Sequence, residues 1–91
     1  MNLNEVNKEI TDTLEKLEKS GFDAYLVGGC VRDLLLNKEP KDWDIATNAL
    51  PEEIQRLFPD SVYENDFGTV AVKTDSEQLH LKIVEITTFR K

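Results

Sequence analysis

Residues Tyr25–Ile45 read YLVGGCVRDLLLNKEPKDWDI and predict a strand, a helix and the start of a second strand. The apolar run that ends at Val27 is typical of a buried strand, and Gly28 and Gly29 follow it directly. The helix-length segment after them ends at Leu36. Glycine lets a backbone approach a ligand closely, and the free N–H groups at the start of a helix attract anions. The two glycines therefore predict a phosphate-binding turn.

Asp42 and Asp44 lie at the start of the next predicted strand. Residues two apart on a strand point to the same face, so the two carboxylates stand roughly 6.5 Å apart at the backbone, with Trp43 and Ile45 on the opposite face. Mg²⁺ commonly binds one or two carboxylates together with substrate phosphates, and paired ions lie about 3.5–4 Å apart in two-metal sites. Without a cation, repulsion between the aspartates would raise the pKa of one of them. The pair therefore predicts a site for divalent metal ions.

Two basic side chains accompany these groups. Arg32 lies one turn into the predicted helix, and Lys41 directly precedes the aspartates. A guanidinium binds phosphate oxygens as a planar fork and an ammonium binds them as a point charge, so both residues are candidates for the outer oxygens of a triphosphate. A glycine pair or an Asp-x-Asp motif alone carries little information. Their order and spacing together indicate a nucleotide site.

From Gly21 onward, the chain resembles the amino-terminal catalytic head of class II tRNA nucleotidyltransferases (CCA-adding enzymes) and bacterial poly(A) polymerases. The resemblance rests on the segments GGCVRDLLL, KDWDIATNALPEEI, FGTVAV and VEITTFR. It implies triphosphate-binding positions, metal ligands and a third acidic position in a neighbouring strand. These fall on Gly28, Gly29 and Arg32, on Asp42 and Asp44, and on Glu85, respectively.

The resemblance implies metal-dependent nucleotidyl transfer from ATP or CTP to the 3′ hydroxyl of RNA, as in tRNA 3′-CCA addition or repair, with Mg²⁺ as cofactor. Asp42, Asp44 and Glu85 are then the catalytic carboxylates. Three alternatives stay open: a poly(A) polymerase head, a nucleotide-binding module without turnover, and an acidic α/β domain whose aspartates cap helices or turns. Carboxylates at all three positions favour the enzyme over a module without turnover.

Glu85 also stands out within its own strand, which is predicted at Leu79–Thr88. The odd positions from 79 to 83 are apolar, so strict alternation places Glu85 on the covered face of the sheet. A buried carboxylate needs a partner, and a metal shared with the aspartates would supply one. The alternative is a bulge at the neighbouring even positions that turns Glu85 to water. We favour the metal site because the resemblance points the same way.

The remaining pattern predicts an α/β (α+β) domain with a mixed sheet of about five strands and helices packed on it. A third helix is expected from Pro51 to Phe58, and further strands are expected at Val62–Glu64 and Thr69–Lys73. Apolar residues recur at helical spacing in a first helix that ends before Gly21: Leu3, Val6, Ile10, Leu14 and Leu17.

The composition of the 91 residues limits the function classes. The single cysteine, Cys30, excludes an intrachain disulfide and is expected in the core, as is Trp43. The single histidine, His80, is expected on the surface. One histidine and one cysteine are too few ligands for a zinc site. No run is long enough to span a bilayer and nothing indicates secretion, so we expect a cytoplasmic protein without a membrane partner.

The net charge of −7 argues against a self-sufficient nucleic-acid binder, because RNA affinity comes largely from lysine and arginine. We expect residues 1–91 to form one nucleotidyltransferase head domain, truncated before the downstream head elements and the helical neck, body and tail that the resemblance implies. ATP and CTP are the expected small-molecule partners. The 3′ end of tRNA is expected to bind through domains absent from this chain.

Overall fold

The computed structural model describes residues 6–64, 68–78 and 81–89. The predicted α/β domain with a mixed five-stranded sheet is confirmed within these residues. The elements follow one another in the order α1 (Lys8–Lys19), β1 (Ala24–Val27), α2 (Gly29–Leu35), β2 (Trp43–Thr47), α3 (Pro51–Leu57), β3 (Ser61–Tyr63), β4 (Thr69–Lys73) and β5 (Ile83–Thr88).

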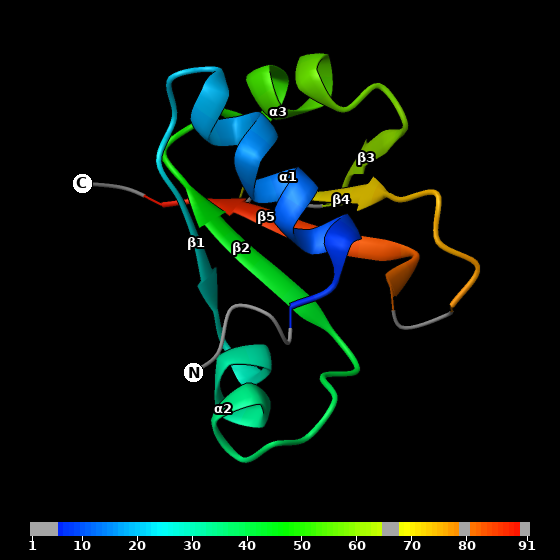
Figure 1. The fold of residues 1–91 in the computed structure, drawn as a ribbon. Coiled ribbons are helices and arrows are strands. Elements are labelled where there is room, and N and C mark those ends of the chain that lie inside the picture. Colours follow the sequence, from blue (N-terminus) through cyan, green and yellow to red (C-terminus); the bar gives the residue numbers. More distant parts are fainter. Residues whose placement is uncertain (1–5, 65–67, 79–80, 90–91) are drawn as a thin grey trace.

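The five strands form a single sheet in the order β1-β2-β5-β4-β3 (Figure 1). Strands β2 and β5 pair in parallel, and the other neighbours pair antiparallel. The chain reaches β5 from β2 through α3, β3 and β4, so two strands about 40 residues apart in the sequence lie side by side at the centre of the sheet. This pairing brings the Asp42–Asp44 segment next to the segment that contains Glu85.

Helices α1 and α3 cover one face of the sheet, and α2 lies beyond the ends of β1 and β2 (Figure 1). The core between these layers includes Ile10 of α1, Ile54 of α3 and Trp43 of β2, all of which are buried. Cys30 is also buried there, so the core positions predicted for Cys30 and Trp43 are confirmed. None of the helices in the described residues is long and apolar enough to cross a membrane.

The opposite face of the sheet carries no helix among the described residues. We call it the open face, and its strand register places these side chains on it: Tyr25, Val27, Asp44, Ala46, Thr69, Ala71, Glu85 and Thr87. The buried residues of the same strands alternate with them and point to α1 and α3. The sheet therefore has one covered face and one face that presents acidic groups.

The strand predicted at Leu79–Thr88 begins only at Ile83, and its covered face was predicted wrongly. The even positions Val84 and Ile86 are fully buried, whereas Ile83 is 50% exposed. Leu81 is also buried, but it lies in the turn before the strand, where its N–H donates to the carbonyl of Gln78 at 3.0 Å. The apolar odd positions therefore do not belong to one strand. Residues 79 and 80, with the surface prediction for His80, lie outside the described residues.

Glu85 consequently belongs to the open face rather than to the covered one. The bulge alternative is also wrong, because β5 pairs without interruption with β2 from Val84 to Thr88 and with β4 from Ile83 to Thr87. The first helix begins at Lys8, so Val6 packs in the core ahead of it, and Leu3 lies outside the described residues.

Candidate functional site

The turn between β1 and α2 is built around Gly28. Its φ of 78° and ψ of −151° are a conformation that side chains rarely adopt. A Cβ placed on Gly28 would also lie 3.2 Å from Oδ2 of Asp44, closer than such atoms normally approach. At Gly29, the first residue of α2, a Cβ would come no nearer than 3.5 Å to the Arg32 guanidinium. Gly28 is therefore the position where the turn and the Asp44 carboxylate meet.

The acidic residues lie on two adjacent strands. Asp44 is the second residue of β2 and is half-buried, and Asp42 lies just before β2 and is exposed. In the parallel ladder Asp44 is directly opposite Glu85 of β5. Neighbouring strands are about 4.8 Å apart and paired residues point to the same face, so these two carboxylates are neighbours on the open face. Sequence reasoning placed all three acids in one site, and the fold brings them together.

The electrostatics of this cluster are unfavourable without a cation. Partial burial is the main cause that raises the pKa of Asp44, and repulsion from the Asp42 carboxylate is the second cause. Partial burial also raises the pKa of Glu85, with further contributions from Glu64, Asp44 and Asp42 in that order. No lysine or arginine forms an ion pair with Asp44 or Glu85 in the described part of the chain. The cluster is a region of negative potential that a bound cation would relieve.

Glu64 is a member of this cluster that sequence reasoning missed. It follows β3, and its N–H donates to the carbonyl of Thr69 at 3.0 Å, so it extends the β3–β4 ladder. Its carboxylate contributes to the raised pKa of Glu85. The sequence contained no signal for this proximity, because it depends on β4 lying between β3 and β5.

The donor set suits a hard cation that shares its coordination with a ligand. Carboxylate oxygens are the protein ligands that Mg²⁺ prefers, usually with water and phosphate completing the shell. Within residues 6–64, 68–78 and 81–89, no three side chains of Asp, Glu, His or Cys converge closely enough to enclose an ion by themselves. Asp42 and Asp44 therefore fit an open Mg²⁺–phosphate site better than a closed protein cage.

A polar depression of about 450 Å³ lies beside the acids and the start of α2. Its lining brings together five residues that were predicted from sequence: Gly29, Arg32, Lys41, Asp42 and Asp44. Gly28 lines an adjoining apolar depression, and Glu85 lies across the ladder from Asp44. Lys38 is a second lysine in the polar lining that sequence reasoning missed.

The Arg32 side chain is free to turn toward a ligand. It is 74% exposed, and its Nε lies 3.7 Å from a carboxylate oxygen of Asp33. Such an exposed ion pair contributes little to stability, so a phosphate can compete for the guanidinium.

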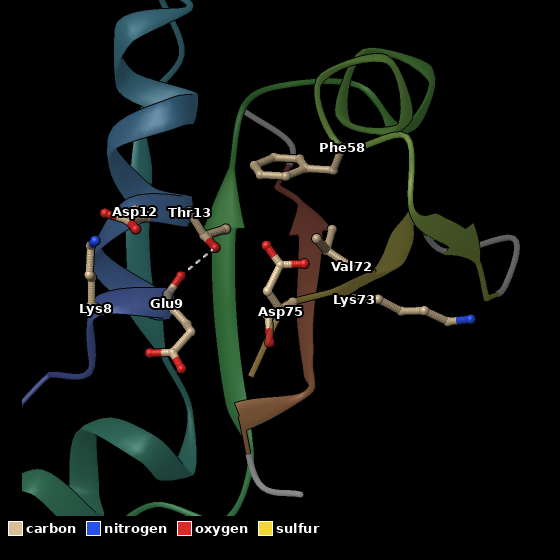
Figure 2. Close-up of a pocket in the computed structure, with 9 residues that line it drawn as sticks. Lys8, Glu9, Asp12, Thr13, Phe58, Val72, Lys73 and Asp75 are labelled. Atoms are coloured by element: carbon tan, nitrogen blue, oxygen red, sulfur yellow. Dashed lines mark hydrogen bonds between the residues drawn. The ribbon is translucent and has the colours of Figure 1, made fainter. Parts of the chain in front are cut away.

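Figure 2 shows a different depression, of about 350 Å³, on the covered side of the sheet. Its lining comes from the first two turns of α1, from Phe58 after α3, and from Val72 and the residues that follow it at the end of β4. Lys8, Glu9 and Asp75 place both signs of charge around it. None of the residues predicted for the nucleotide site lines this depression.

Comparison with known proteins shows the family of the chain. The family profile of the poly(A) polymerase head domain matches residues 24–91. The chain is 47% identical to the CCA-adding enzyme of Lactobacillus delbrueckii subsp. bulgaricus over 97% of this chain and 21% of that enzyme. It is 58% identical to poly(A) polymerase I of Haemophilus influenzae over 57% of this chain and 12% of that polymerase.

A solved structure shares the fold as well as the sequence. The Bacillus stearothermophilus CCA-adding enzyme in complex with CTP superposes with a TM-score of 0.77 at 39% identity, over 92% of this chain and 21% of that one. The chain thus spans about a fifth of the length of the CCA-adding enzymes that it matches.

Proposed function

Because the chain belongs to the poly(A) polymerase head domain family, we propose that it carries the chemical centre of a nucleotidyltransferase. The reaction is transfer of a nucleotidyl group from ATP or CTP to the 3′ hydroxyl of RNA, as in 3′-CCA addition to tRNA. The observation that supports it most is the position of Asp44, which lies opposite Glu85 in the ladder and against the Gly28 backbone. A metal-binding group and a phosphate-binding group are adjacent there.

The carboxylates of this chain would hold the metal. Asp42 and Asp44 are the ligands, and Glu85 supports them from β5 through its position across from Asp44. When bound, Mg²⁺ lowers the pKa of an attacking hydroxyl and neutralises charge on the leaving pyrophosphate. A cation held there would offset the repulsion between carboxylates, which adds to partial burial in raising the pKa values of Asp44 and Glu85.

The basic and glycine groups would hold the triphosphate. The backbone at Gly28 and Gly29 lets phosphate oxygens approach the start of α2, where no side chain intervenes. Arg32 and Lys41 line the same depression as the aspartates. They can therefore pair with some oxygens of a phosphate group while its other oxygens face the metal. These groups orient the leaving pyrophosphate toward α2.

The acceptor is proposed to be the 3′ end of tRNA, because a structural relative, the CCA-adding enzyme of Thermotoga maritima, was solved in complex with tRNA. The net charge of −7 means that this chain contributes little of the affinity for a long RNA. We expect negligible tRNA binding by these 91 residues at physiological salt. The specificity for a CCA end then does not reside in this chain.

A second candidate is a poly(A) polymerase head. The identity of 58% to poly(A) polymerase I over 52 residues favours it. Both candidates use the same carboxylates and the same triphosphate groups. The products distinguish them, because a poly(A) polymerase extends RNA with ATP alone and a CCA-adding enzyme also incorporates CTP.

The test is extension of a short single-stranded RNA in the presence of Mg²⁺ and labelled ATP or CTP, resolved on a sequencing gel. We expect slow extension with both nucleotides and none with Asp42→Ala or Asp44→Ala. The matched control is Asp12→Ala, which removes an exposed acid on α1, and circular dichroism checks each fold. Unchanged extension by Asp44→Ala contradicts the proposal. Mg²⁺-dependent nucleotide binding without any extension favours the binding module instead.

A further inference from the structure

Two aromatic side chains lie on the open face at the end away from Gly28. The rings of Tyr25 and Phe89 have centroids 6.2 Å apart and are tilted by 39°. Tyr25 is opposite Ala46 in the β1–β2 ladder and is 55% exposed. Phe89 follows β5, and its N–H donates to the carbonyl of Thr47 at 2.8 Å. The two rings therefore come from β1 and from the residue after β5, on either side of β2.

The open-face side chains beside these rings are small. Ala46 pairs with Thr87 across the β2–β5 ladder. The Thr87 hydroxyl is 3.0 Å from the Thr69 hydroxyl, and one of the two donates to the other. A planar ligand that lies on this surface therefore covers polar groups that already share a hydrogen bond.

The groups of the open face are arranged in a linear order. Along β2, Ala46 follows Asp44 by two residues, and along β1 the antiparallel order is Tyr25, Val27 and then Gly28. Residues two apart on a strand are roughly 6.5 Å apart. Gly28 thus lies on one side of Asp44. On the other side, Tyr25 is level with Ala46, one such step from Asp44, and Phe89 follows Glu85 by two such steps.

This order has a consequence for an in-line reaction. In nucleotidyl transfer, the attacking and the leaving oxygen lie roughly opposite each other across the phosphorus. If the pyrophosphate leaves toward Gly28 and Arg32, the attacking 3′ oxygen approaches the acids from the side of Ala46. The sugar that carries this oxygen also carries the terminal base, which brings the base to the aromatic pair.

We propose that Tyr25 and Phe89 form a stacking platform for the 3′-terminal base of the RNA acceptor. The inference rests on the proposed function, which defines where the pyrophosphate leaves. Aromatic rings stack on any base, so the platform positions the acceptor end without selecting its sequence. It is continuous with the acidic cluster through Ala46 and needs no basic surface of its own.

Photo-crosslinking tests the platform at low affinity. A short single-stranded RNA carries 5-iodouridine either at its 3′ terminus or at an internal position, and the chain is irradiated with each RNA in Mg²⁺ without nucleotide. Mass spectrometry then locates the attached residue. We expect the terminal probe to attach to Tyr25 or Phe89, and the internal probe to attach there much less.

Variants separate stacking from other contributions. Tyr25→Ala should lower the yield of the terminal crosslink to Phe89 roughly 5- to 150-fold below saturation, the loss expected for one stacked base. Tyr25→Phe keeps the ring and should retain most of that yield. Tyr63→Ala removes an exposed tyrosine on β3, opposite buried Val70, and should leave the yield unchanged. Phe89→Leu removes the second aromatic ring and keeps an apolar side chain at that position, so it tests stacking independently.

Calorimetric titration with Mg²⁺–CTP keeps this test separate from the proposed function. Wild type and Tyr25→Ala should bind the nucleotide equally, because Tyr25 lies away from the phosphate-binding turn. Intact nucleotide binding with no terminal crosslink at Tyr25 or Phe89, or with equal crosslinking by both probes, overturns the platform alone. If the wild-type chain does not bind Mg²⁺–CTP at all, the proposed function itself is overturned.

Discussion

At Gly28 a single residue determines both the shape of the turn and the space available to the Asp44 carboxylate. Gly28→Ala places a Cβ at positive φ and 3.2 Å from Oδ2 of Asp44. We expect a loss of about 1–3 kcal/mol in the free energy of unfolding and weaker triphosphate binding. Urea denaturation followed by the fluorescence of Trp43, the single tryptophan, measures the first effect.

Gly29→Ala is the matched control for this prediction. Gly29 begins α2 without a positive φ, and its added Cβ makes only an ordinary contact with Arg32. Stability should change by less than about 1 kcal/mol. Equal destabilisation by the two substitutions would show that Gly28 has no special part in the turn.

The Asp44 carboxylate is expected to destabilise the metal-free protein at neutral pH. Burial and Asp42 raise its pKa above the ordinary value of 3.8, so the folded state binds the proton more tightly than the unfolded state. The cost of ionisation is therefore present above the raised pKa, and it disappears as the pH falls below 3.8. Asp44→Asn should stabilise the protein at neutral pH by at most about 1 kcal/mol and give no advantage in acid.

Thermal unfolding in a chelator at neutral and acid pH measures this difference, with Asp12→Asn as control. Addition of Mg²⁺ should raise the melting temperature of wild type more than that of Asp44→Asn, because the variant loses a ligand. Lower stability of Asp44→Asn at neutral pH without metal would be the opposite of this expectation.

Arg32 is expected to contribute to ligand affinity and little to the fold. Its side chain is 74% exposed, and a charge-assisted hydrogen bond to phosphate is worth about 1.5–3 kcal/mol. Arg32→Ala should therefore weaken triphosphate binding by that amount, whereas Arg56→Ala on α3 should not. Equal affinity of wild type for a triphosphate and its nucleoside would exclude this role for Arg32.

At the scale of the elements, the end of β2 is fixed by a buried hydroxyl. The Thr47 hydroxyl donates to the carbonyl of Asp23 and accepts the N–H of Ala49 at 3.2 Å, and Thr47 is fully buried. Thr47→Val keeps the shape but leaves both groups unpaired. We expect a loss of about 1–3 kcal/mol in urea denaturation.

Thr11→Val is the control for this prediction, because Thr11 is partly exposed and its hydroxyl donates to the nearby carbonyls of Asn7 and Lys8. Its effect should stay within about 0.5 kcal/mol. Comparable effects of the two substitutions would contradict a special contribution from the Thr47 hydroxyl to the β1–β2 connection.

The sequence predicted the elements near the site better than the last strand. Gly28, Pro51 and Asp42 mark local boundaries through backbone geometry and turn chemistry, and such signals act within a few residues. The covered face of β5 depended on which apolar residues belong to the strand, and Leu81 lies in the turn before it. The approach of Glu64 to Glu85 needed the strand order, which no local pattern contains.

At the scale of the whole molecule, one face of the sheet forms the core that stabilises the fold, and the other face carries the groups proposed for ligand binding. The covered face buries the apolar residues of β2 and β5 against α1 and α3. The open face presents the acids, the aromatic pair and small side chains between them. Substitutions of open-face acids should therefore change ligand binding without disrupting the core.

Titration calorimetry with and without Mg²⁺ tests most directly whether the acids and the Gly28 turn form one metal–triphosphate site. We expect ATP and CTP to bind weakly with similar affinity, only when Mg²⁺ is present, and adenosine not to bind. Asp44→Ala should abolish this binding and Asp12→Ala should leave it unchanged. Binding of the triphosphates that persists in Asp44→Ala, or that does not require Mg²⁺, would contradict the account.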